Sequence, residues 1–109
     1  MPHFICLITF TQQGLQQLGA TTKRAEAFSE RAEKMGAKVL ATYWTLGMYD
    51  LVHIIEAADE KTACSLALSS LAVGNVRTHT LPAFTLEEMR EDILPNVQTP
   101  YDLIRDGQD

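Results

Sequence analysis

The order of six patterned segments constrains the fold of this chain more than any other feature of its sequence. Residues 4–10 (FICLITF) are apolar at almost every position, which is typical of a central strand covered on both faces. The pattern then predicts a helix over about 22–35, strands over about 38–46 and 49–57, a helix over about 59–73 and a strand over about 76–84. With right-handed crossovers, this β-α-β-β-α-β order predicts a four-stranded antiparallel sheet in strand order 4-1-3-2. Both helices then lie on one face, which is the α+β, ferredoxin-like fold.

Each expected helix carries one apolar stripe with which it would dock on the sheet. In the first helix the stripe is Ala25, Phe28, Ala32 and Met35, and in the second it is Ala63, Cys64, Ala67, Leu68 and Leu71. Gly36 follows the first helix where a left-handed residue belongs, and Asp59 is a good N-cap for the second. Residues 11–22 (TQQGLQQLGATT) are expected to form a long loop with one helical turn. Gly47 and Met48 are expected to form a two-residue hairpin loop of type II′.

The C-terminal region is expected to divide into a short helix and a tail. Thr85 and Glu88 form a capping-box pattern that opens a helix, which ends at about residue 94, before a proline. We therefore expect residues 1–94 to form a single domain that includes this helix. Residues 95–109 are then an extended or disordered tail.

Composition and charge exclude several classes of protein. The 109 residues carry nine Lys and Arg against fourteen Asp and Glu, and the net charge of −5 argues against a nucleic-acid binder. No apolar run approaches the roughly 20 residues that span a bilayer, and no signal-peptide pattern precedes the first strand. The two cysteines, Cys6 and Cys64, fit neither a disulfide framework nor a zinc site. A cytoplasmic protein is therefore the expectation.

The sheet face opposite the helices is the feature that predicts self-association. If Phe4, Cys6 and Ile8 face the helices, the other face carries the apolar side chains of Ile5, Leu7, Leu51 and Ile55. A monomer would expose them as a patch of several hundred Å², which is larger than monomers usually tolerate. We therefore expect a homodimer in which two sheets pack face to face as a barrel.

The hairpin and the segments around it resemble a known family. Residues 45–52 read TLGMYDLV, with Gly47, Tyr49 and Asp50 forming a Gly-x-Tyr-Asp signature. The further similar segments are TQQG (11–14), the pair Lys23 and Arg24, IIEAADE (54–60) and GNVRTHTLPAFT (74–85). On these residues the chain resembles the GYD domain family over roughly residues 3–90. The resemblance implies a dimeric α/β barrel and leaves the biochemical role undefined.

A second resemblance rests on the same succession of hairpin, helix and Gly-x-Val strand. It is similar to the effector-binding domain of leucine-responsive transcription regulators, which binds amino acids near a subunit interface. No helix-turn-helix precedes the domain in this chain. The resemblance therefore implies a stand-alone ligand-binding version and no reading of DNA.

Two histidines are candidates for ligand contact. If Val52 and Ile54 face the helices, His53 lies on the open face. His79 joins it if the last strand turns Arg77, His79 and Leu81 to the same face, and neither side of that strand is clearly more apolar. Two strand spacings, about 10 Å, would separate them, so that both rings converge over Leu7. Metal binding would also need a carboxylate on this face, and none is evident. A polar barrel lining without chemistry is therefore the favoured interpretation, and neither a metal nor a cofactor is expected.

Four further residues are weaker candidates for a ligand site. Tyr49 and Asp50 belong to the hairpin, where an aspartate typically accepts backbone hydrogen bonds and a tyrosine packs across the strands. Trp44 lines a possible pocket near the hairpin, or serves as an anchor between subunits. Arg77 is suited to clamp a carboxylate ligand, but pairing with an acidic residue such as Glu56 or Asp50 of a neighbouring strand or subunit is the favoured interpretation.

Three functions remain open at this point. The first is a small homodimeric module that binds a small apolar or zwitterionic molecule in or beside the barrel. The second is a cofactor-independent enzyme, such as an oxygenase or isomerase, with His53 or His79 as general base. The third is an assembly protein with no small-molecule site. We rank them in this order.

Overall fold

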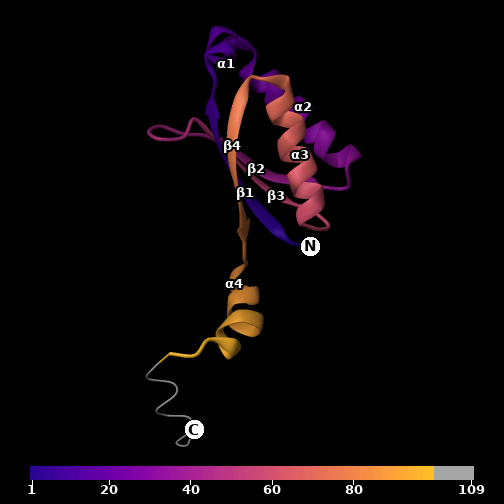
Figure 1. Ribbon diagram of the computed structural model, residues 1–109, viewed down its shortest axis with the longest axis vertical. Coiled ribbons are helices and arrows are strands. Elements are labelled where there is room, and N and C mark those ends of the chain that lie inside the picture. Colours follow the sequence, from indigo (N-terminus) through magenta and orange to yellow (C-terminus); the bar gives the residue numbers. More distant parts are fainter. Residues whose placement is uncertain (100–109) are drawn as a thin grey trace, which may run out of the picture.

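The computed structural model describes residues 1–99 and contains the expected four-stranded antiparallel sheet (Figure 1). Its strands are β1 (His3–Phe10), β2 (Lys38–Trp44), β3 (Leu51–Glu56) and β4 (Val76–Ala83). They are arranged as β2-β3-β1-β4, with every neighbouring pair antiparallel. This is the predicted 4-1-3-2 order read from the other edge, so the α+β, ferredoxin-like prediction is confirmed.

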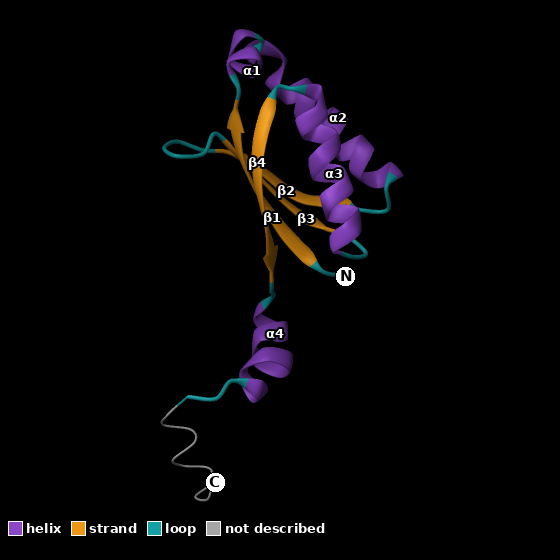
Figure 2. Ribbon diagram, in the orientation of Figure 1, coloured by secondary structure: helices purple, strands orange, loops and turns teal. Residues whose placement is uncertain are grey.

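The two long helices, α2 (Thr21–Lys34) and α3 (Glu60–Val73), cover the same face of the sheet (Figure 2). As expected, α2 buries Phe28 and Ala32 of its apolar stripe. The carboxylate of Asp59 accepts a 2.8 Å hydrogen bond from the Thr62 backbone N–H and caps α3. Gly74 ends α3 in the left-handed conformation at φ 93°.

The predicted stripe of α3 was only partly right. Ala63 is buried as expected, but the other residue that α3 buries is Leu66, whereas Cys64 and Leu68 are exposed. Apolar residues occur on almost every side of this helix (TACSLALSSLAV), so the sequence does not define a single face.

Residues 11–20 were expected to be mostly loop and instead form two short helices, α1 (Gln12–Gln16) and the 3₁₀ helix η1 (Leu18–Ala20). The hydroxyl of Thr11 caps α1 by accepting from the Gly14 N–H and donates to the Gly74 carbonyl at 2.7 Å. Gln13 Nε2 donates to Asn75 Oδ1 at 3.1 Å. Gly14 lies so close to the backbone of Asn75 that no Cβ would fit. These contacts fix α1 to the turn between α3 and β4.

The connection between β2 and β3 is longer than predicted. β2 ends at Trp44 and β3 begins at Leu51, so a six-residue loop replaces the expected two-residue turn. Gly47 has a φ of 105°, which requires glycine as expected. The loop projects beyond the sheet (Figure 1). Its two apolar side chains, Leu46 and Met48, are exposed.

Beyond β4 the chain forms a helical segment that projects away from the domain (Figure 1). It contains α4 (Leu86–Glu88), the π-helical turn η2 (Met89–Ile93) and the 3₁₀ helix η3 (Leu94–Asn96). The predicted capping box between Thr85 and Glu88 is present. We call residues 84–97 the C-terminal arm; its exposed apolar side chains are Phe84, Leu86, Met89, Leu94 and Val97.

The arm explains the elongated shape of the molecule. The radius of gyration is 17.9 Å, whereas a compact domain of this length has about 13 Å. The expected tail begins at Pro95, which lies inside η3, and residues 100–109 lie outside the described residues. Its extended conformation therefore stays a prediction. Within residues 1–99, no helix has the length and apolarity that crossing a membrane requires.

Candidate functional site

Strand register assigns each side chain to one of the two sheet faces, because residues directly opposite each other share a face. Leu7 lies opposite both Val52 and His79, and Ile5 lies opposite Ile54 and Leu81. These side chains point away from α2 and α3. We call this surface the open face; its other members are His3, Thr9, Lys38, Ala41, Tyr43, Glu56, Arg77 and Ala83.

The open face holds three of the predicted site residues. The rings of Tyr49 and His79 make an edge-to-face contact, with centroids 5.9 Å apart. Arg77 lies on the same strand two residues before His79, so it projects from the same face. No carboxylate within residues 1–99 forms an ion pair with Arg77, which does not support the expected structural pairing within the chain. Tyr49, His79 and Arg77 are therefore polar groups toward one end of this surface, and the paired His3 and Glu56 are polar groups at its other end.

Asp50 and Trp44 are held by contacts within the chain. The carboxylate of Asp50 accepts a hydrogen bond from the Phe10 N–H at 2.9 Å, and its own N–H donates to the Ile8 carbonyl at 2.8 Å. Asp50 therefore fastens the loop to β1. Trp44 lies on the helix side of the sheet, where its Nε1 donates to the hydroxyl of Thr21 at 3.0 Å.

The expectation that His53 lies on the open face is wrong. His53 is opposite Cys6, so it faces the helices, and only 2% of its surface is exposed. Its ring stacks on Phe28 at 4.3 Å, and Nδ1 lies 2.8 Å from the hydroxyl of Thr42. The assignment failed because Leu51, Val52, Ile54 and Ile55 are all apolar, so the alternation along β3 does not reveal which side is inside.

This placement prevents His53 and His79 from meeting on one ligand, because the sheet separates them. The same error misplaced Leu51 and Ile55, which are buried beneath the helices with His53. Burial lowers the pKa of His53 to about 4, and the ring is therefore neutral at pH 7. Cys6 is buried in the same layer, and burial raises the pKa of its thiol. Within residues 1–99, no three His, Cys, Asp or Glu side chains gather where they could hold a metal ion.

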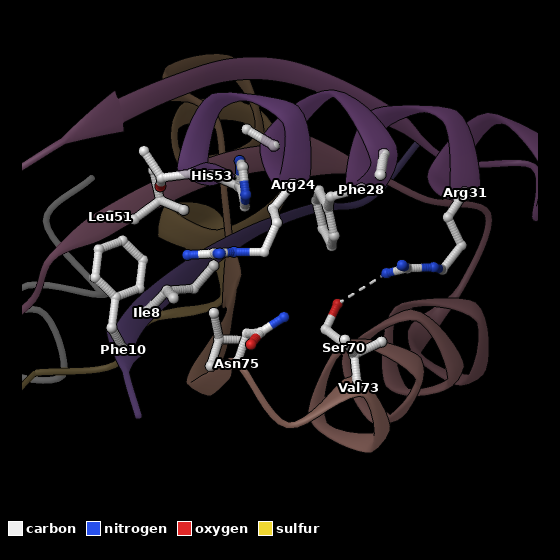
Figure 3. Close-up of a pocket in the computed structure, with 14 residues that line it drawn as sticks. Ile8, Phe10, Arg24, Phe28, Arg31, Leu51, His53, Ser70, Val73 and Asn75 are labelled. Atoms are coloured by element: carbon white, nitrogen blue, oxygen red, sulfur yellow. Dashed lines mark hydrogen bonds between the residues drawn. The ribbon is translucent and has the colours of Figure 1, made fainter. Parts of the chain in front are cut away.

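A cavity of about 170 Å³ lies between the sheet, α2 and the end of α3 (Figure 3). Apolar side chains such as Ile8, Phe28 and Leu51 form much of its wall, and His53 closes it on the sheet side. The charged groups beside it are the guanidinium groups of Arg24 and Arg31, both half-buried. Sequence reasoning missed this site, since the cavity exists only where residues distant in sequence fold together.

Some residues at one end of the cavity belong to sequence segments that were already singled out for their family resemblance. TQQG, Arg24 and the start of GNV belong to segments that carried the family resemblance, and no role was assigned to them. In the structure, Arg24 donates to the carbonyls of Gln17 and Gly14 at 2.7 and 3.2 Å. Together with the Gln13–Asn75 hydrogen bond, these contacts build one end of the cavity.

The model of the GYD domain family matches residues 4–93. The chain belongs to this family. A relative from Thermus thermophilus, the glutamine synthetase and cystathionine beta-lyase binding protein, is 34% identical over 90 residues. The aligned region covers 82% of this chain and 95% of the relative.

A solved structure agrees with the fold. The crystal structure of TTHA0845 from Thermus thermophilus matches with a TM-score of 0.51 and 25% sequence identity, covering 78% of this chain and 95% of that one. Both comparisons use almost the whole length of the other protein and leave about a fifth of this chain unmatched. The family match itself ends at residue 93, inside the C-terminal arm.

Proposed function

We propose that this member of the GYD family is a cytoplasmic homodimeric binding module that pairs two copies through their open faces and binds other proteins. The observation that carries the proposal is the open face itself. Ile5, Leu7, Val52, Ile54 and Leu81 form a continuous apolar surface across three strands. Water contact with so much apolar area is unfavourable, and a second copy of the same face removes it from both partners.

Charge supports pairing of like with like. The two rows of the open face that contain Ile5 and Leu7 hold no aspartate or glutamate, while Arg77 lies at one end of the face and the paired His3 and Glu56 lie at the other. Two copies related by a twofold axis would place apolar rows against apolar rows, while the polar groups Tyr49, His79 and Arg77 would line the barrel interior or its ends.

Dimerisation is tested with two exposed leucines that lie on opposite sides of the molecule. Leu81 on the open face is 46% exposed and Leu68 on α3 is 59% exposed, so neither substitution damages the core of a single chain. We expect Leu81→Glu to weaken the dimer at least about 100-fold in sedimentation equilibrium, because it buries an unpaired charge. Leu68→Glu is the control and should leave the dimer intact. A Leu81→Glu variant as dimeric as the control would contradict the proposal.

The proposal that the chain binds other proteins has two supports. The Thermus thermophilus relative is named for the two enzymes that it binds, and this chain has exposed apolar side chains. Leu46 and Met48 project from the β2–β3 loop with 101% and 81% of their surfaces exposed. Exposed apolar side chains on a projecting loop are suited to act as anchors at an interface. We therefore propose enzymes of nitrogen or sulfur amino-acid metabolism as partners, glutamine synthetase and cystathionine beta-lyase being the first to test.

The partner proposal is tested by biolayer interferometry with the immobilised dimer and each purified enzyme from the same organism. We expect one or both enzymes to bind, and the double variant Leu46→Ser and Met48→Ser to weaken binding at least tenfold. The substituted side chains are free of the core, so the dimer should persist. Absence of binding by both enzymes to the intact dimer would contradict this part of the proposal and leave dimerisation standing.

A small molecule within the barrel is a second candidate, and the contact between Tyr49 and His79 favours it. A purely apolar interface would not need an aromatic and imidazole pair beside an arginine without an acidic partner in the described chain. Native mass spectrometry of protein purified without chelator tests this candidate. Additional mass on the dimer that disappears in His79→Ala is expected, and a dimer of the bare chain mass under the same conditions would contradict it.

A further inference from the structure

We propose that the cavity between α2, α3 and the sheet binds a small organic anion with an apolar body, of the aryl or branched-chain carboxylate class, and that Arg31 holds its carboxylate. This site lies on the opposite side of the sheet from the open face. The inference is therefore independent of the proposed dimer and of the proposed protein partners.

The electrostatics of the cavity select an anion. Among its fourteen lining residues are two arginines and no aspartate or glutamate. The one ion pair of residues 1–99 joins His3 and Glu56 and involves neither Arg24 nor Arg31. The cavity therefore carries an uncompensated positive charge in a chain whose net charge is −5. A planar guanidinium is suited to bind a carboxylate with two parallel hydrogen bonds.

The two arginines differ in how many donors they have left. Arg24 already donates to the carbonyls of Gln17 and Gly14, which makes it part of the structural frame. Arg31 makes one long hydrogen bond of 3.4 Å, to the hydroxyl of Ser70 (Figure 3). A guanidinium has five N–H donors, so most of those on Arg31 are available. We therefore assign the carboxylate to Arg31 and give Arg24 a supporting electrostatic role.

Two buried side chains that border the cavity, Asn75 and His53, each have one nitrogen atom without a hydrogen-bond partner in residues 1–99. Asn75 is 8% exposed; its Oδ1 accepts from Gln13, and its Nδ2 has no hydrogen-bond partner within residues 1–99. His53 is 2% exposed and contacts Thr42 through Nδ1, while the structure gives Nε2 no partner. Neither atom is cut off from solvent, because His3 Nδ1 is the one fully buried side-chain nitrogen or oxygen of residues 1–99 that has no partner. Both atoms are therefore free to bind water or a ligand. A ligand with polar atoms would satisfy both groups.

The size and the wall of the cavity define the rest of the ligand. Its volume is about 170 Å³, and an apolar cavity of about 150 Å³ accommodates a molecule of benzene. Ile8, Phe28 and Leu51 provide an apolar surface for a ring or a branched alkyl group. Because no carboxylate lines the cavity, an ammonium group would lack a partner there. The site should therefore prefer a simple or 2-oxo acid over the corresponding amino acid.

Isothermal titration of the wild-type protein with phenylacetate at pH 7 tests the site. Three controls separate the contributions: phenylacetamide removes the charge, acetate removes the ring, and phenylalanine adds an ammonium group. We expect phenylacetate to bind and each control ligand to bind at least tenfold more weakly. Equal binding of phenylacetamide would overturn the role of charge, and absence of phenylacetate binding at 10 mM would overturn the proposal.

Two arginine variants locate the binding. Arg31→Gln should weaken phenylacetate binding at least tenfold, whereas the matched Arg90→Gln, at an exposed position on the C-terminal arm, should leave it unchanged. Arg31 is half-buried on the surface of α2, so the variant is expected to fold, and its circular dichroism spectrum checks this. Chemical-shift changes at Ser70 and Asn75 on adding phenylacetate provide a second readout. Unchanged binding by Arg31→Gln, or shifts confined to the open face, would overturn the assignment.

Discussion

The two faces of the sheet use similar side chains and differ in what covers them. Along β3, Leu51, His53 and Ile55 alternate with Val52 and Ile54, and each set is mostly apolar. The first set is buried under α2 and α3, while the second belongs to the open face. The comparison teaches that strand register, and not hydrophobicity, determines which face of this sheet an apolar side chain belongs to. The open face therefore needs a cover that the described chain does not supply.

Ile55 and Ile54 are neighbours on opposite faces and provide the sharpest test of this comparison. Ile55 is 1% exposed, so Ile55→Ala should cost about 2–5 kcal/mol in the free energy of unfolding. This cost should not depend on protein concentration, because the contact lies within one chain. Ile54→Ala should destabilise the proposed dimer, and its effect should therefore vary with protein concentration. Denaturation at two protein concentrations measures both; equal concentration dependence would break the comparison.

Protonation of His53 tests how well the helix-covered face is closed. The pKa of the folded state is about 4, below the value of about 6.5 for an unfolded chain. The unfolded state therefore binds the proton first as pH falls, and stability that is complete above pH 6.5 is lost toward pH 4. Between pH 7 and pH 4.5 the loss is about 2–3 kcal/mol.

Urea denaturation of the wild type and of His53→Phe at the two pH values isolates this contribution. The phenylalanine ring retains an aromatic contact with Phe28 and cannot take up a proton. The difference between the two proteins should therefore shift by about 2–3 kcal/mol in favour of the variant at pH 4.5. A parallel decline of both proteins would mean that water reaches His53 and that this face is not closed.

Alanine substitutions at Gly14 and Gly19 have the smallest expected effect on the free energy of unfolding. They test the contact between α1 and the rest of the domain at one end of the helix-covered face. A Cβ on Gly14 would clash with the backbone of Asn75, whereas a Cβ on Gly19 would meet nothing within 4 Å. Gly14→Ala should therefore cost about 1–3 kcal/mol in the free energy of unfolding. Gly19→Ala should be neutral or slightly stabilising. Thermal denaturation measures both, and equal melting temperatures would show that α1 does not close this end.

The sequence was sufficient for the fold because its signals are local and agree with one another. Asp59 and Gly74 mark the two ends of α3, and Phe28 and Ala32 mark the face of α2 that packs on the sheet. The order of helices and strands is compatible with few sheet topologies. The faces of β3 were not predictable in this way. Because apolar residues flank His53 on both sides, the alternation of side chains along β3 is satisfied equally well with His53 facing the helices or facing away from them.

The cavity was beyond sequence reasoning for a different reason. Arg31 and Ser70 are 39 positions apart in the sequence, and Gln13 and Asn75 are 62 apart. Each pair meets only because α2, α1 and the end of α3 pack together over β1. On the sequence alone, Arg31 was one charge among many on an exposed helix face.

Native mass spectrometry of the wild-type protein tests the central claim most directly, because it counts the copies in one assembly. If the open face is covered by a second copy, the assembly should have twice the 12.1 kDa mass of the chain, or a multiple of that pair. A species of single-chain mass at micromolar concentration would contradict the claim, since Ile5, Leu7, Val52, Ile54 and Leu81 would then be open to water.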